Sequence, residues 1–212
     1  MASSVIFVGS PEKNPTNSMK SFKRLFYVSP HDVFFRIFAA FVPPIGKKYQ
    51  KVYVDLQGPL LALLLLISFV NYGHSFKTTN TFRSPTEAVV VYSIIMPVLC
   101  FTLCKLGSSC ITLFETTSLI GYGLYGHILT LLMSFLCFQE SSNFFFFVCL
   151  TFFGGLSTLR IALVVLGTLV VPAARLLICS VISTINILFL TFLHFAYMHH
   201  TFIHKAYADV SR

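Results

Sequence analysis

The sequence predicts an all-α membrane protein: a bundle of five transmembrane helices preceded by a short cytosolic amphipathic helix. Two observations lead to this fold class. The chain of 212 residues is 56% hydrophobic and only 10% charged, which is more apolar surface than one globular core of this size can bury. Its apolar residues also gather in runs long enough to cross about 30 Å of hydrocarbon as helices.

Residues 1–54 form the first predicted region, a basic cytosolic segment. Its early apolar stretch, SVIFV, is too short for a secretory signal. The stretch SPHDVFFRIFAAFVPP predicts a short helix over about 30–42, with Ser29 as N-cap, Pro30 in the first turn and two prolines at the end. Apolar side chains cover most of one side, so this helix is expected either at the membrane surface or against the bundle.

Residues 55–198 form the predicted transmembrane domain, and 199–212 a short lumenal tail. The expected spans are Gly58–Tyr72, Ala88–Leu106, Thr117–Phe138, Phe144–Val171 and Ala173–Met198. The first is short for a full crossing. The fourth is long, so it should tilt or bend.

Basic residues predict the orientation of the bundle. With the amino end in the cytosol, ten Lys and Arg lie on the cytosolic side and four on the lumenal side, Arg160 left aside. This distribution follows the positive-inside rule and places the carboxyl end in the lumen. Topology and anionic lipid headgroups therefore account for the net charge of +8, and no nucleic-acid partner is implied.

The entrance to the first span reads DLQGPL. Asp55 precedes Gly58 and Pro59, and proline suits the first helical turn because it has no amide hydrogen to leave unpaired. An aspartate near the positive end of the helix dipole is also favourable. These residues predict a well-defined helix start.

The third span contains GYGLYG, which matches the G-x-G-x-x-G spacing of dinucleotide-binding loops. Its surroundings are apolar and continuous, without the strand, turn and downstream acidic residue that such a loop needs. On a helix, Gly123, Gly126 and Thr130 form one stripe. We interpret this stripe as a helix-packing face, with the lining of a polar cavity as the alternative, and we expect no cofactor there.

The fourth span carries a second ridge of small residues, Gly154, Thr158 and Ala162. Arg160 lies on the same span, where a guanidinium is costly unless it snorkels or pairs. Three roles stay open for it. It caps a helix end at the headgroups, it is buried against Asn186, His194 or Glu115, or it serves a substrate or ion.

The last span places polar residues on one helical face: Ser183, Asn186, His194 and Tyr197. That face should point into the bundle. His194 there is either a hydrogen-bonded interior residue or a proton relay. His199, His200 and His204 follow the span, but no cysteine or carboxylate completes a tetrahedral set, so no metal is expected.

The six cysteines lie within or beside the spans and form no CxxC pair, so they are expected to be reduced, with acylation at Cys104 or Cys110 as an alternative. No paired intramembrane carboxylates, H-E-x-x-H or G-x-S-x-G motif is present. The sequence therefore predicts no catalytic residues and no cofactor.

Five stretches together resemble one family. They are DLQGPL at 55–60, GYGLYGH at 121–127, GGLSTLR at 154–160, RLLICS at 175–180 and LFLTFLHFAY at 188–197. This set is similar to the Yip-domain, or YIPF, family of membrane proteins, and most similar to its third member type. The amino-terminal segment differs, because it is short and basic where the animal proteins have a longer acidic region.

The resemblance implies a five-span protein of the cis-Golgi and ER–Golgi intermediate membranes, without catalytic activity. It further implies assembly with the fourth member type and contact with Rab-class GTPases or coat machinery. By the same resemblance, the helix-packing or partner interface includes Gly121, Tyr122, Gly123 and Gly126. The leading hypothesis is thus a non-enzymatic Golgi membrane organiser that supports vesicle transport. The alternative is a small transporter or channel, in which Arg160, Asn186 and His194 converge on a midplane site.

Overall fold

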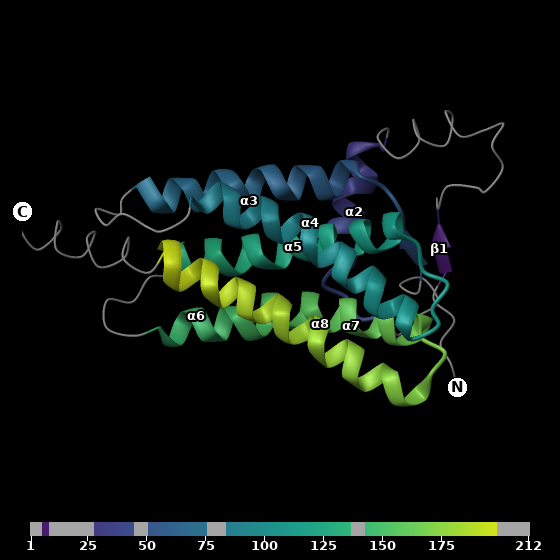
Figure 1. The fold of residues 1–212 in the computed structure, drawn as a ribbon. Helices are drawn as coiled ribbons and strands as arrows, with labels where there is room; N and C mark the ends of the chain where they lie inside the picture. The colour runs from purple at the N-terminus through teal and green to yellow at the C-terminus, as the bar shows by residue number, and fades with distance from the viewer. Residues whose placement is uncertain (1–5, 9–27, 45–50, 76–83, 137–142, 199–212) are drawn as a thin grey trace, which may run out of the picture.

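The structure is a computed structural model, and it describes residues 6–8, 28–44, 51–75, 84–136 and 143–198. Within these ranges five helical segments are long and apolar enough to cross a membrane, which confirms the five-span all-α bundle. Figure 1 shows the five segments side by side, with a further short helix, α2, at one end of the bundle. We call this the α2 end.

The spanning segments follow the predicted ones closely. They are α3 (Gln57–Ser75), α4 (Pro85–Leu106), α5 (Leu113–Leu136), α6 (Phe144–Cys149) continued by the π-helical turn η2 (Leu150–Gly154) and α7 (Gly155–Thr168), and α8 (Pro172–Leu193) continued by η3 (His194–Met198). Before them come α2 (Pro30–Ala39) and two short parallel strands, β1 (Ile6–Val8) and β2 (Lys51–Tyr53). The strands were not predicted.

Helix α5 begins at Leu113, four residues before the predicted Thr117, because polar residues cap it. The hydroxyl of Thr112 accepts from the amide of Glu115 at 3.4 Å, and the Glu115 carboxylate accepts from the amide of Thr112 at 2.8 Å. This reciprocal pair is a capping box. Glu115 therefore serves the start of its own helix and not Arg160.

A π-helical turn interrupts the long fourth span, which was expected to tilt or bend. The π-helical turn η2 interrupts the α-helical pattern between α6 and α7, and such turns are a common cause of helix bending. The helix then continues through Arg160 to Thr168, where Leu169 turns to extended backbone. The expectation that the helix ends near Arg160 is thus wrong.

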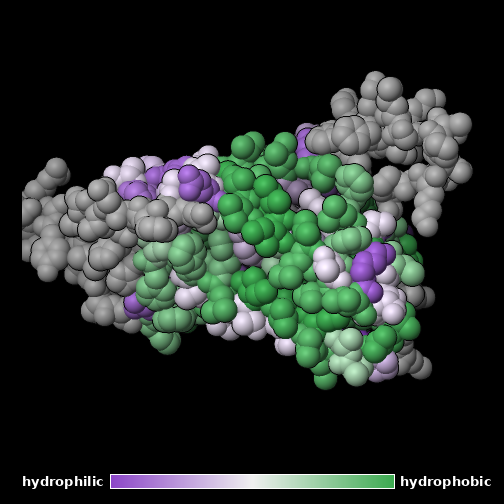
Figure 2. All heavy atoms as spheres, in the orientation of Figure 1, coloured by the Kyte–Doolittle hydropathy of each residue, from purple (hydrophilic) through white to green (hydrophobic). Residues whose placement is uncertain are grey.

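Helix α5 lies at the centre of the bundle. It contacts α3 and α4 on one side and α6, η2 and α7 on the other, while α8 packs on α7 and α4. Figure 2 shows apolar side chains across the middle of the visible face, with hydrophilic side chains toward its two ends. This distribution is the one expected where hydrocarbon surrounds the bundle.

Residues 28–44 and 51–54 pack on the bundle. Helix α2 follows Ser29, which makes no side-chain cap bond, and it buries Val33 and Ala39 while it contacts α5. Val52 on β2 belongs to the hydrophobic core. Of the two placements expected for α2, the structure has the one against the bundle, although Phe34 and Phe38 stay exposed.

Candidate functional site

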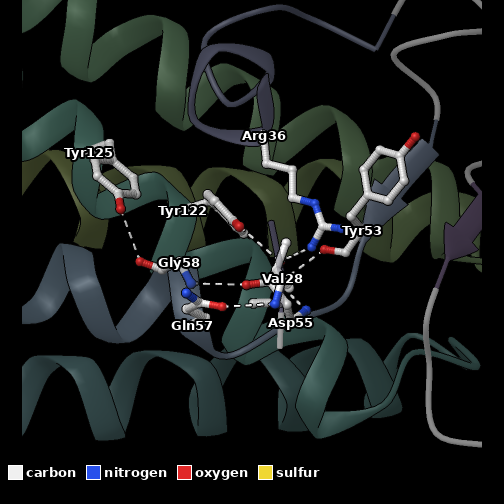
Figure 3. Close-up of polar contacts among 9 residues, drawn as sticks. Val28, Arg36, Tyr53, Asp55, Gln57, Gly58, Tyr122 and Tyr125 are labelled. Carbon is white, nitrogen blue, oxygen red and sulfur yellow. Dashed lines mark hydrogen bonds and ion pairs between the residues drawn. The ribbon is translucent and has the colours of Figure 1, made fainter. Parts of the chain in front are cut away.

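A buried carboxylate at the α2 end joins α2, α3 and α5. Asp55 is fully buried just before α3, and its Oδ1 accepts from the amide of Gly58 at 3.0 Å. Its Oδ2 accepts from Arg36 Nη1 at 2.5 Å and from the Tyr122 hydroxyl at 2.8 Å. Figure 3 shows these partners converging from three elements. We call this cluster the polar junction.

Further bonds hold the backbone around the carboxylate. The Ser118 hydroxyl accepts from the Asp55 amide at 3.3 Å and donates to the Tyr53 carbonyl at 3.1 Å. The Tyr125 hydroxyl donates to the Gly58 carbonyl at 3.1 Å. Arg36 also lies over the Tyr53 ring, 4.8 Å from its centroid. The charge is thus paired and hydrogen-bonded, as a buried carboxylate must be.

The two glycine motifs of the sequence are the two halves of this junction. A β-carbon on Gly58 would overlap the Tyr122 ring, and one on Gly121 would overlap Pro59. Glycine therefore lets α3 and α5 approach closely enough for Tyr122 to reach Asp55. DLQGPL and GYGLYG were singled out separately in the sequence, and the structure brings them together.

The next stripe on α5 packs against α7. A β-carbon on Gly126 would lie 2.6 Å from Ser157 Cβ, and one on Gly123 would lie 2.6 Å from Ile161 Cδ1. The Ser157 hydroxyl donates to the Gly123 carbonyl at 3.0 Å, and that of Thr130 donates to the Gly126 carbonyl at 2.7 Å. These residues lie inside one chain, so their positions offer no surface to a partner.

The small-residue ridge of the fourth span faces α8. A β-carbon on Gly154 would lie 2.8 Å from the Leu190 side chain. The Thr158 hydroxyl accepts from Asn186 Nδ2 at 2.6 Å, and the carbonyl of the half-buried Ala162 accepts from the Cys179 thiol at 3.3 Å. This ridge too is used within the chain.

Asn186 connects four helices in the bundle interior. Besides its bond to Thr158 on α7, its Oδ1 accepts from the Tyr92 hydroxyl on α4 at 2.6 Å. Its backbone carbonyl lies 3.3 Å from His127 Nε2 on α5. Tyr92 in turn stacks on Phe189, with ring centroids 3.6 Å apart. Sequence reasoning missed Tyr92 and His127, because nothing in their spacing links them to Asn186.

Arg160 lies elsewhere. It is 6% exposed, and its Nη1 donates to the backbone carbonyl of Val42 at 2.6 Å. Arg160 and Thr158 are about 200° apart around α7, so Arg160 faces the segment after α2 while Thr158 faces α8. Nearby, Phe41 packs edge-on against Phe153, which holds that segment on the bundle.

The midplane site proposed for a transporter is therefore not assembled. Asn186 bonds to Tyr92 and Thr158, Arg160 bonds to Val42, and His194 stacks on Phe146 with ring centroids 3.7 Å apart. All three are buried, but each has its own surroundings. The expected contact of Arg160 with Asn186, His194 or Glu115 is wrong, because the carbonyl of Val42 takes that place.

In the described ranges no three His, Cys, Asp or Glu side chains gather as metal ligands. The histidines at 199, 200 and 204 and Cys137 lie outside those ranges. Of the cysteines described, Cys110 is exposed and Cys104 is buried.

An apolar groove of about 250 Å³ lies between α3, α4 and α5. Two polar residues line it, Ser93 and Thr117, and their hydroxyls donate to carbonyls of their own helices.

Comparison with known proteins gives one family. The family model described as the YIPF3 C-terminal domain matches residues 30–198. The match begins at the first residue of α2 and ends at the last residue of η3. No solved structure matches the chain.

The first prediction concerns the charge at the junction. Asp55→Asn keeps the shape of the side chain but leaves the Arg36 guanidinium without its counter-charge, so unfolding in detergent should become easier by about 3 kcal/mol. Tyr122→Phe removes one hydrogen bond and should cost about 1 kcal/mol. Thermal unfolding of the purified protein measures both. If both variants unfolded like the unchanged protein, the polar junction would contribute no stability.

The second prediction compares two identical substitutions. Gly126→Ala forces a methyl group against Ser157 and should destabilise the protein by about 1–3 kcal/mol. Gly155→Ala places the methyl in ordinary contact, with its nearest atom at 3.6 Å, and should be neutral or stabilising by up to about 1 kcal/mol, because alanine favours helix. The same unfolding assay checks both, and destabilisation of similar size in the two variants would contradict the close α5–α7 contact.

Proposed function

Because the chain belongs to the Yip-domain (YIPF) family, we propose that it is a non-enzymatic organiser of Golgi and ER–Golgi membranes that assembles with a second YIPF-family protein. Proteins of this family are in general non-enzymatic and associated with membrane trafficking. The observation that carries the proposal is the family match, which extends over α2 and all five spanning segments.

The way the chain uses its polar residues supports an organising role. Several buried polar side chains in the described ranges connect one helix to another, as at Asp55, Asn186 and Thr130. Each bond satisfies a polar group that would otherwise be unpaired in hydrocarbon, and it fixes the position of one helix relative to another. The helices are thus held to one another inside the bundle, and its outer surface is left to meet lipid or other proteins.

The partner contact belongs on that outer surface. Since Gly123, Gly126 and Gly154 are occupied within the chain, the earlier idea that these stripes assemble the complex gives way to contact through the outer helix faces. Large exposed apolar side chains are available on α3, α4 and α8, among them Leu64, Ile94 and Leu177. We further propose the third member type for this chain, and therefore the fourth type as its partner.

The α2 end would face the cytosol in this proposal. The basic residues expected there by the charge rule would present the complex to Rab-class GTPases or coat components. The carboxyl end would then lie in the Golgi lumen. Both statements rest on charge distribution and family, and the side of the membrane on which the α2 end lies is tested below.

The third prediction concerns assembly. Capture of the tagged full chain from Golgi membranes in mild detergent should recover another YIPF-family protein in a fixed ratio, measured by native mass. Gly126→Ala should lower the yield of folded chain but leave the ratio of partner to chain unchanged, because that glycine packs inside. Recovery of the chain alone, as a monomer or homo-oligomer, would contradict the proposal.

The fourth prediction concerns orientation. Cys110 is exposed between α4 and α5 at the α2 end. In sealed Golgi vesicles carrying Cys137→Ser, a membrane-impermeant maleimide should label the chain without permeabilisation, and Cys110→Ser should abolish that labelling. Labelling that requires permeabilisation would place the α2 end in the lumen.

A further inference from the structure

A small cavity at the α2 end lies between α2, β2, α5 and α7. Its volume is about 30 Å³. Three cationic side chains line it: Arg36 from α2, Lys51 from β2 and Arg160 from α7. Most of the remaining lining is small or apolar and includes Ala39, Ala40, Val52, Leu119, Gly123 and Ile161. The cavity is therefore positively charged on an otherwise apolar background.

Positive charge here exceeds the negative charge that neutralises it. Asp55 pairs with Arg36. Arg160 is almost fully buried and donates to a backbone carbonyl, and no carboxylate in the described part of the chain forms an ion pair with it. The same holds for Lys51, which is exposed. A buried guanidinium without a counter-charge is costly, above all inside a membrane span. Arg160 lies in such a span, about 12 Å of helix length before the end of α7.

We propose that this cavity binds a phosphate group, held by Arg160 and Lys51 with Arg36 at its edge. A guanidinium has five N–H donors, and one nitrogen of Arg160 is engaged by Val42. Arginine and phosphate match in planar, two-bond geometry, and lysine adds a point charge. The hydroxyls of Tyr122 and Ser157 also line the cavity but donate elsewhere, so the cations carry the recognition.

The size of the cavity limits the ligand. The cavity is small, about 30 Å³, so we infer that a compact terminal phosphate group enters it while the rest of any larger ligand stays outside. Inorganic phosphate has this chemistry, and so does a lipid whose headgroup ends in a phosphomonoester.

The outer face of α2 lies where lipid headgroups would be. Phe34 and Phe38 are 73% and 66% exposed and lie one turn apart on the helix that carries Arg36. Exposed aromatic residues on an amphipathic helix at the end of a membrane bundle suit the boundary between headgroups and acyl chains. Lys51, which lines the cavity at the same end of the bundle, is exposed.

Two probes separate the sources of the phosphate. The full chain in nanodiscs of phosphatidylcholine, with or without phosphatidic acid, is analysed by native mass spectrometry and thermal unfolding. The same protein in phosphatidylcholine alone is titrated with inorganic phosphate, with chloride at equal ionic strength as the reference. We expect saturable binding of at least one probe. Binding of phosphatidic acid alone identifies the lipid as the source, and binding of inorganic phosphate alone identifies the free ion.

Matched lysine variants make the test specific. Lys51→Ala should weaken binding about tenfold or more, as the loss of one charge-assisted bond does, whereas Lys105→Ala removes an exposed lysine outside the cavity and should leave binding unchanged. Arg160→Gln should abolish binding. If Arg160→Gln does not fold, the two lysine variants still decide. The proposal would be overturned if Lys51→Ala and Lys105→Ala weakened binding equally, or if a folded Arg160→Gln bound the probe undiminished. It would also be overturned if neither probe shifted thermal unfolding more than chloride and phosphatidylcholine do.

Discussion

The buried carboxylate of Asp55 is the interaction on which the α2 end of this bundle depends. A charge at 0% exposure is tolerated only when it is paired and hydrogen-bonded, and each partner here comes from a different element. Arg36 brings α2, Tyr122 brings α5, and the amide of Gly58 brings the first turn of α3. The pairing and hydrogen bonding of this one carboxylate thus set the relative positions of three helices.

Small residues make that arrangement sterically possible. Tyr122 reaches the carboxylate because Gly58 leaves room for its ring. Helix α5 approaches α7 closely because Gly126 has no β-carbon to overlap Ser157. Helices in a bilayer gain little from apolar burial alone, so close approach and interhelical hydrogen bonds carry much of their association. Asn186 shows the second device, since its amide and carbonyl link α8 to α4, α5 and α7.

The interior of the bundle consequently serves packing within the chain, whereas its exterior is open to lipid and to other proteins. The glycine stripes and the Asn186 network are occupied by packing within the chain, which leaves the apolar outer faces for lipid or for another membrane protein. Charge that is not needed for packing gathers at the α2 end, where Arg160 and Lys51 line a cavity without a carboxylate partner in the described ranges. Assembly and recognition of a charged group would thus occupy separate surfaces.

By itself the sequence determined the five spans and the small residues that line their packing faces, because apolar length and helical periodicity are local properties. Only the tertiary structure decided which elements meet. The Thr112–Glu115 cap moved a helix start, and β1 and β2 paired across more than 40 residues. Arg160 found the carbonyl of Val42, 118 positions away on irregular backbone. Such contacts depend on how a non-periodic segment folds back on the bundle, and no spacing in the sequence encodes that path.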